Sequence, residues 1–133
     1  NEALAGFMRL MNICEERGSG IDKVKSWIEA EHLPPPTFRR TDTHTVAVLT
    51  APKGYGKMTQ EERVRACYQH ACLCYVSGEA MTNATLRKRF EIAAENYTQA
   101  SRVIADATKG GLIKLSAQAS LSTRDRKYLP FWA

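Results

Sequence analysis

The sequence predicts an α+β fold, in which a truncated α/β segment is followed by a three-helix domain with a β-ribbon. Three observations support this prediction. Apolar residues recur at helical spacing in five stretches, glycine and proline clusters separate these stretches, and short runs of strand-forming residues lie between or after them. With 44% hydrophobic and 25% charged residues among 133, the chain has the composition of a globular protein and is expected to fold.

Two amphipathic helices are predicted at the start. The first covers residues 2–16 and ends in the turn Arg17-Gly18-Ser19-Gly20, where glycine can adopt the left-handed conformation. The second begins at Ile21 and ends before the prolines at 34–36, which cannot continue a helix. The apolar residues at helical spacing are Leu4, Phe7, Met8, Met11 and Cys14 in the first helix and Ile21, Val24, Ile28 and Leu33 in the second, with Trp27 alongside.

Strand structure is predicted after the prolines. Phe38 and the run His44–Thr50 have the threonine and valine content of strands. Such a region needs further strands, and the chain begins with Asn1 inside a predicted helix. We therefore expect residues 1–50 to be the C-terminal part of an α/β domain of a longer protein. Residues 51–57 combine proline and glycine without any period and are predicted to be a linker.

Residues 58–133 are predicted to form a second domain with three helices. Thr59 can cap the first helix, Thr82 or Asn83 can cap the second, and Gly110-Gly111 ends the third before a short strand at 112–115. The helices are predicted to run to about Val76, to about Phe90, and from about Asn96 to Lys109. The side chains expected inside are Val64, Cys67, Tyr68, Ala71, Tyr75, Leu86, Phe90, Ala100, Val103, Ile104 and Ala107.

This order of helices, glycine turn and β-ribbon is typical of a winged helix-turn-helix domain, whose third helix enters the major groove of DNA. On that helix, Gln99 suits adenine edges and Arg102 suits guanine edges or phosphate, whereas Asp106 would repel the DNA backbone. The residues predicted to contact DNA are Asn96, Thr98, Gln99, Arg102, Lys109, Arg124, Arg126 and Lys127. Each of them could equally be an ordinary solvated side chain.

The positive charge of the chain lies in this second half. The formal net charge is +5; residues 1–56 hold seven basic and seven acidic residues, and residues 57–133 hold twelve and seven. A localised positive charge is typical of contact with a polyanion, because each neutralised phosphate releases counterions. The cluster of Arg124, Arg126 and Lys127 is predicted to neutralise phosphates beside the third helix. A solubilising surface would explain the charge equally well.

The four cysteines give no strong indication of a site. Cys14, Cys67, Cys72 and Cys74 do not form CxxC pairs, so we expect neither a disulfide framework nor a redox motif. Cys67 and Cys74 could share a helical face with His70, which makes zinc binding an alternative. Because free cysteines are the common state in a reducing cytosol, we predict no metal site.

Several segments, taken together, resemble Schlafen/AlbA-type transcriptional regulators. The segments are Glu16–Ile21, Leu33–Phe38, Tyr68–Val76, Met81–Phe90, Ala100–Ile104, Gly111–Lys114 and Tyr128–Ala133. The resemblance implies an α/β domain of the kind named after histidine-kinase-type ATPases or a helicase C-terminus, followed by a winged helix that reaches an intact C-terminus. A glycine turn before a helix can present N–H groups to phosphate, so Gly18, Ser19 and Gly20 are candidates for nucleotide binding. A simple helix-to-helix turn is the alternative.

The leading hypothesis is a cytoplasmic DNA-binding fragment of a transcription regulator that contacts double-stranded DNA, with a homodimer as the usual arrangement. No apolar run reaches the roughly 18 residues of a membrane span. We found no carboxylate pair or activated nucleophile and predict no catalytic residue and no cofactor, and we expect His32 and His44 at the surface. The alternatives are a protein-interaction or dimerisation module, or nucleotide-binding, hydrolase or nuclease activity in the full-length protein.

Overall fold

The computed structural model describes residues 2–14, 19–117 and 126–133. Five α-helices and two small antiparallel sheets make up this part of the chain, which confirms the predicted α+β class. The elements are α1 (Glu2–Leu10), α2 (Ser19–Ala30), β1 (Thr37–Arg40), β2 (Thr45–Val48), η1 (Tyr55–Lys57), α3 (Gln60–Val76), α4 (Asn83–Arg89), η2 (Ala94–Asn96), α5 (Tyr97–Lys109), β3 (Ile113–Leu115) and β4 (Tyr128–Pro130). None of the helices described is long and apolar enough to cross a lipid bilayer.

The first helix, α1, is shorter than predicted and its apolar stripe is not covered. It ends at Leu10 rather than at residue 16, and no residue in it is buried. More than half of each of the side chains of Leu4, Phe7 and Met11 in its apolar stripe is exposed. Helical spacing identifies the face that needs a partner and not whether one packs against it.

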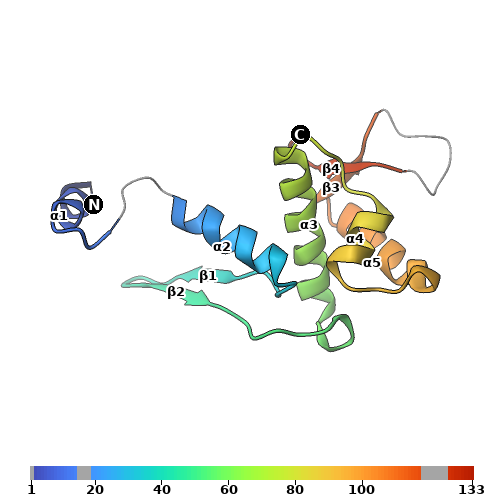
Figure 1. Ribbon diagram of the computed structural model, residues 1–133, viewed down its shortest axis with the longest axis horizontal. Helices are drawn as coiled ribbons and strands as arrows, with labels where there is room; N and C mark the ends of the chain where they lie inside the picture. Colours follow the sequence, from blue (N-terminus) through green and yellow to red (C-terminus); the bar gives the residue numbers. More distant parts are fainter. Residues whose placement is uncertain (1, 15–18, 118–125) are drawn as a thin grey trace.

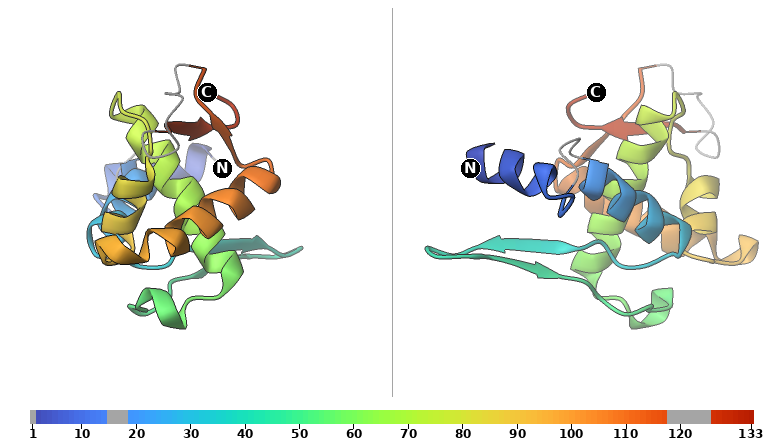
Figure 2. Two further views of the ribbon diagram at one scale, coloured as in Figure 1. Left: turned by 90° about the vertical axis from the view of Figure 1, so that its right-hand side faces the viewer. Right: turned by 60° about the vertical axis from the view of Figure 1, so that its left-hand side comes forward.

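Helix α2 and the hairpin β1–β2 follow the prediction more closely. Ile28 of α2 is buried, but Ile21 and Trp27 are exposed, so only the end of the helix nearest α3 is covered. Strands β1 and β2 pair antiparallel, with Thr37 opposite Val48. In both views of Figure 2 this hairpin projects away from the helices that follow it. The sheet has two strands in the described part of the chain, so it forms no layered α/β core there.

Helix α3 is the longest helix described and begins at the predicted cap. The Thr59 hydroxyl accepts from the backbone N–H of Glu62, and the Glu62 carboxylate accepts from the N–H of Thr59. This capping box satisfies two backbone donors that a helix start leaves free. Cys67 and Ala71 are buried as predicted, whereas Tyr75 is 41% exposed, which corrects its predicted burial. The Tyr75 ring instead meets Trp132 edge-on, at 5.3 Å between centroids.

Helices α4 and α5 pack side by side against α3 (Figure 1). Thr82 caps α4 through a second capping box, in which its hydroxyl accepts from the N–H of Thr85. Leu86 and Phe90 are buried at the end of this helix, as predicted. The four residues of α5 predicted to face the core are buried as well: Ala100, Val103, Ile104 and Ala107. Helical periodicity therefore gave the correct inner face of α5.

The turn after α5 leads directly into the second sheet. Gly111 has a φ of +68°, a conformation that side chains other than glycine rarely adopt. Strand β3 then pairs antiparallel with β4, with Ile113 opposite Pro130. A bridge between Met81 and Tyr128 ties β4 to the segment before α4. The hairpin therefore lies beside the three helices.

One hydrophobic core holds α3, α4, α5 and β3 together. Its buried members are Met58, Ala66, Cys67, Ala71, Met81, Leu86, Phe90, Ala100, Val103, Ile104, Ala107 and Ile113. Three of the seven residues predicted as linker form η1, and the ring of Tyr55 in it lies 5.3 Å from that of Phe90. The guanidinium of Arg63 stacks over the other side, 4.2 Å from the centroid of the Tyr55 ring. Tyr55 thereby extends the core beyond α3.

Polar contacts join α3 and α4 to the first part of the chain. The guanidinium of Arg65 donates to the Thr37 hydroxyl at 2.8 Å and to the Pro36 carbonyl at 2.6 Å. Arg89 of α4 donates to the carboxylate of Glu29 and to the Leu33 carbonyl, both at 2.7 Å. These bonds hold the end of α2 and the proline segment against the three-helix unit.

Candidate nucleic-acid interface

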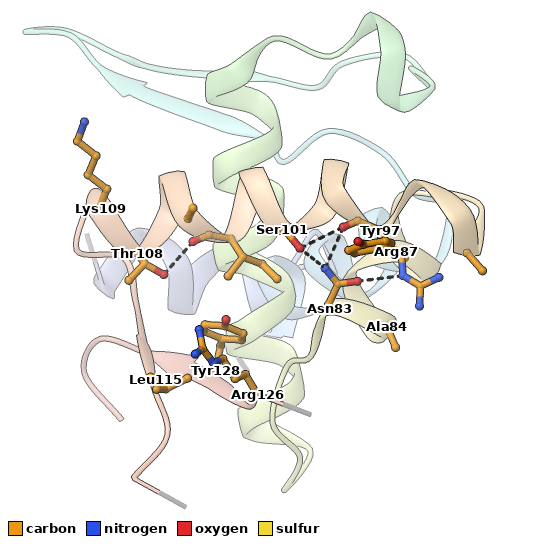
Figure 3. A pocket seen from close by; sticks show the side chains of 13 residues that line it. Asn83, Ala84, Arg87, Tyr97, Ser101, Thr108, Lys109, Leu115, Arg126 and Tyr128 are labelled. Atoms are coloured by element: carbon orange, nitrogen blue, oxygen red, sulfur yellow. Dashed lines mark hydrogen bonds between the residues drawn. The ribbon is translucent and has the colours of Figure 1, made fainter. Parts of the chain in front are cut away.

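An open groove runs between the start of α4, one side of α5 and the hairpin β3–β4 (Figure 3). Its volume is about 1180 Å³. The residues that line it are Asn83, Ala84, Arg87, Ala94, Tyr97, Ser101, Ile104, Ala105, Thr108, Lys109, Leu115, Arg126 and Tyr128. All three elements that a winged helix would present to DNA therefore contribute to one concave surface.

Asn83 organises the end of the groove where α4 and α5 meet. Its amide donates to the Tyr97 carbonyl at 3.1 Å and to the Ser101 hydroxyl at 3.0 Å. Its amide oxygen accepts from Nε of Arg87 at 3.0 Å. Figure 3 shows these bonds as dashed lines. One side chain thus fixes the spacing of the two helices and orients an arginine at the rim.

The charged side chains that line the groove in the described part of the chain are all positive. Arg87 comes from α4, Lys109 from the end of α5 and Arg126 from the residues just before β4. Among the described residues, no Asp or Glu lines the groove. Hydroxyl donors from Tyr97, Ser101 and Thr108 lie along the floor, although Ser101 and Thr108 each donate back to a carbonyl of α5. The three cations are suited to phosphate oxygens, whereas the Ser101 and Thr108 hydroxyls use their single hydrogen within α5.

The predicted contact residues of α5 do not all face the same way. Thr98, Arg102 and Lys109 are exposed on the side of the helix opposite its buried stripe, and Asn96 is exposed at the end of η2. Gln99 is half-buried on the flank toward η1, where its backbone carbonyl accepts from the Tyr55 hydroxyl at 3.5 Å. Gln99 therefore lies on the flank of α5 away from the hairpin.

Asp106 lies on the same flank as Gln99. Its carboxylate accepts from the side-chain amide of Gln60 at 3.1 Å. At 100° per residue, positions 99 and 106 fall on one side of α5, and positions 97, 101 and 108 fall on the other. The carboxylate that seemed unfavourable for DNA binding is therefore turned away from the groove.

The structure adds groove residues that the sequence analysis did not select. Tyr97, Ser101 and Thr108 lie at helical spacing next to the buried stripe of α5, on the side that faces the hairpin. Asn83 and Arg87 come from a different helix. The spacing of 97, 101 and 108 was visible in the sequence, but the position of the hairpin beside this flank was not.

The basic cluster near the C-terminus is only partly described. Arg126 lines the groove, and Lys127 is exposed beside it. The Lys127 carbonyl accepts from the N–H of Ser116 at 2.9 Å, which extends the β3–β4 pairing. Arg124 lies outside the described residues.

A second polar cluster lies at the contact between α2, α3 and α4. One carboxylate oxygen of Glu29 lies 2.5 Å from Nδ1 of His70, and the other accepts from Nε of Arg89 at 2.7 Å. On its other side, Nε2 of His70 is 3.6 Å from Sγ of Cys74. The side chain of Arg89 is 1% exposed, and its Nη1 has no hydrogen-bond partner among the described residues. An ion cluster thus joins three helices in a largely dry setting.

The contacts in this cluster shift the pKa values of its members. Burial raises the pKa of Glu29, but the hydrogen bond to His70 and the charge of Arg89 outweigh it and lower the pKa below 4.5. Burial also lowers the pKa of His70, but its hydrogen bonds with Cys74 and Glu29 outweigh this effect and raise the pKa to about 9. His70 is therefore a cation at neutral pH.

These shifts predict a pH dependence of stability. A histidine whose pKa rises from 6.5 to about 9 on folding contributes stability that is fully present below pH 6.5 and is lost as the pH rises to about 9. The lowered pKa of Glu29 adds stability above pH 4.5 that is lost on acidification. We expect the melting temperature to fall between pH 6.5 and 9, measured by circular dichroism. The same slope in His70→Gln would contradict the assignment.

The structure does not bring Cys67, His70 and Cys74, the residues considered for zinc, together at one point. Sγ of Cys67 is buried and lies 3.8 Å from Sδ of Met81, while His70 contacts Cys74 and Glu29. Within residues 2–14, 19–117 and 126–133, no group of three or more His, Cys, Asp or Glu side chains is arranged to hold a metal ion.

His32 is not simply a surface residue, which corrects that prediction. It is half-buried with a φ of 54°, and its Nδ1 lies 2.9 Å from the Arg89 carbonyl oxygen. It thus adds to the contact between the first part of the chain and α4. His44 is exposed, as predicted, at the turn between β1 and β2.

One known family resembles the first part of the chain. Residues 1–49 match the family model described as "Putative ATP-dependent DNA helicase recG C-terminal". This segment is therefore similar to an ATPase-type family segment. No curated protein and no solved structure matches the chain.

The candidate nucleotide turn lies at the start of α2. Gly18 is outside the described residues, and α2 begins at Ser19. A Cβ at Gly20 would meet nothing within 4 Å, so crowding does not require glycine there. The first turn also carries Asp22, whose carboxylate would repel phosphate. Nucleotide binding by Ser19 and Gly20 therefore stays a prediction.

Proposed function

We propose that residues 58–133 form a winged helix-turn-helix domain that binds duplex DNA as part of a transcription regulator. Helix α5 is the recognition helix, α4 is the helix before it, and the β3–β4 hairpin is the wing. The order of the elements supports this assignment, as does their packing around one core. The excess of positive charge in residues 57–133 supports it as well.

The observation that carries the proposal is the cationic groove beside α5. Arg87 of α4, Lys109 of α5 and Arg126 just before β4 each contribute a cation, and no carboxylate of residues 2–14, 19–117 or 126–133 lines the surface. A DNA backbone that passes between α5 and the wing would meet these three cations. Contacts of this kind position a duplex without reading its sequence.

Base recognition belongs to the outer side of α5 in this proposal. Thr98 and Arg102 are exposed there, on the part of the helix that would enter the major groove. Lys109 follows them at the end of the helix. Gln99 is assigned no role in base reading, because its half-buried position on the flank toward η1 turns it away from the wing.

A salt titration tests whether the protein binds DNA through phosphates. Binding of a fluorescent duplex is followed by anisotropy at several salt concentrations. We expect log K to fall linearly with log salt, with a slope of about −0.9 for each phosphate neutralised. By the same relation, three groove cations that each neutralise one phosphate predict a slope of about −2.7 or steeper. Affinity that does not change with salt would overturn the proposal.

Two neighbouring residues of α4 provide a matched pair of variants. Arg87 lines the groove and is oriented by Asn83, whereas Lys88 is exposed and does not line it. Arg87→Ala should weaken binding for every duplex and reduce the salt slope by about 1, and Lys88→Ala should change it much less. Equal effects of the two substitutions would mean that charge alone, and not the groove, drives binding.

Substitution of Arg102 tests base recognition separately. If Arg102 reads a guanine, Arg102→Ala costs about 1–3 kcal/mol on the preferred sequence and little on unrelated duplexes. The preferred sequence is obtained by selection from a random duplex pool. A protein that selects no sequence and forms stable dimers without DNA would instead be a protein-interaction module.

The family match of residues 1–49 favours a second candidate, nucleotide binding by the first part of the protein. A ligand that binds only the folded state raises the melting temperature. Addition of ATP and Mg²⁺ to the chain tests this candidate directly. An unchanged melting temperature would argue against nucleotide binding by these residues.

A further inference from the structure

Cys74, His70 and Glu29 form a line of three interacting side chains at the contact between α3 and α2. The Glu29 carboxylate holds Nδ1 of the imidazole at 2.5 Å, so that Nε2 points at Sγ of Cys74, 3.6 Å away. His70 and Cys74 lie one helical turn apart on α3, which keeps them in register. Neither the DNA-binding proposal nor the family match assigns a role to this arrangement.

The other cysteines of α3 do not face a histidine. Complete burial raises the pKa of Cys67 to about 12, and its sulfur faces Met81. Cys72 is half-buried and interacts with Tyr68, Lys25 and Trp132, but burial outweighs their effect and raises its pKa as well. Thiols react as thiolates, so both changes disfavour reaction at neutral pH. Cys74 is also half-buried, but its sulfur faces a histidine that is positively charged at neutral pH.

We propose that Cys74 is a thiol-modification site that forms mixed disulfides with small disulfides. The Cys74 thiol releases its proton to water and Sγ attacks one sulfur of the disulfide. A new S–S bond forms, the old one breaks, and the leaving thiolate takes a proton from water. The imidazolium of His70 stabilises the negative charge on Sγ during the attack.

The position of the site gives the modification a structural consequence. Cys74 contacts His70, which contacts Glu29 of α2, and Glu29 in turn pairs with Arg89 of α4. A bulky group on Sγ of Cys74 must either push the His70 imidazole out of its contact with Glu29 or turn the sulfur away from the imidazole. Modification therefore loosens the attachment of α2 to the three-helix unit.

Exposure of the folded protein to glutathione disulfide tests the proposal. Peptide mapping by mass spectrometry at early times gives the rate at each cysteine. At pH 7 we expect Cys74 to gain glutathione at least about 10-fold faster than Cys72, its matched control two residues away. Reversal by dithiothreitol identifies the product as a disulfide. Equal rates at the two cysteines would overturn the proposal.

Two further measurements assign the effect to His70. His70→Gln should reduce the rate at Cys74 to about that at Cys72, and no change would overturn the proposal. If this variant does not fold, the pH dependence of the two modification rates in the natural protein tests the same role of His70. The charged groups facing His70 and Cys74 are Glu29 and, through it, Arg89. The ratio of the Cys74 rate to the Cys72 rate should fall as the pH passes 9, where His70 loses its charge; a constant ratio would contradict the role of His70.

Discussion

Replacing Glu29 with alanine is expected to destabilise the protein by about 3 kcal/mol, because it leaves the buried guanidinium of Arg89 without a counter-charge. The Arg89 side chain is 1% exposed and, among the described residues, keeps the Leu33 carbonyl as its one hydrogen-bond partner. His70 loses the carboxylate that favours its charged form. Chemical denaturation should show the loss as a lower midpoint with an unchanged slope.

Glu31 provides the matched control for this substitution. It lies two residues further along, it is exposed, and its replacement with alanine should change stability by less than about 0.5 kcal/mol. A loss in Glu29→Ala no larger than that in Glu31→Ala would show that the ion cluster contributes nothing to stability. The double variant Glu29→Ala with Arg89→Leu should recover part of the loss, because it removes the unpaired charge as well.

The fold of the second half could be predicted largely from local sequence signals. Thr59 and Thr82 cap helices because their hydroxyls can accept from the free N–H groups of a first turn, an effect that is contained within four residues. The inner face of α5 followed from helical periodicity, since alanines, a valine and an isoleucine recur there at the spacing of one turn. Such signals do not depend on distant parts of the chain.

The features that could not be predicted are contacts between residues that lie far apart in the sequence. Glu29 contacts His70 and Arg89 across 41 and 60 residues, and nothing near any of the three indicates the pairing. The apolar stripe of α1 was correct as a helical pattern, but Phe7 in it remains 59% exposed. Periodicity shows which side of a helix needs a partner; it does not show where that partner is.

In the candidate site, too, local features could be predicted from the sequence, whereas contacts between distant residues could not. Arg102 and Thr98 could be selected as exposed residues of α5 once its buried stripe was known. The groove required the position of the β3–β4 hairpin, whose second strand is separated from the first by more than ten residues. Asn83 could be recognised as a candidate helix cap, but its bonds to Tyr97 and Ser101 depend on how α4 packs against α5.

Truncation of Leu86 to alanine is expected to cost about 3 kcal/mol of stability, because it opens a cavity in the centre of the core. Leu86 is fully buried on α4, between the helices that form the groove. Leu10→Ala makes the same chemical change at a side chain that is 78% exposed, and should cost less than about 0.5 kcal/mol. Thermal unfolding of the two variants gives the comparison, and similar melting temperatures would contradict the assigned core.

A comparison of Leu86→Ala with Arg87→Ala distinguishes effects on stability from effects on DNA binding. Its neighbour Arg87 lines the groove, so adjacent residues of one helix serve the core and the proposed interface. Leu86→Ala should lower the melting temperature by roughly 10 °C, and well below that temperature its folded protein should bind duplex DNA as the natural protein does. Arg87→Ala should do the reverse, with weaker binding and a nearly unchanged melting temperature. If Leu86→Ala weakened binding as much as Arg87→Ala under conditions where both variants are folded, the groove would depend on the packing of α4 and not on its charges.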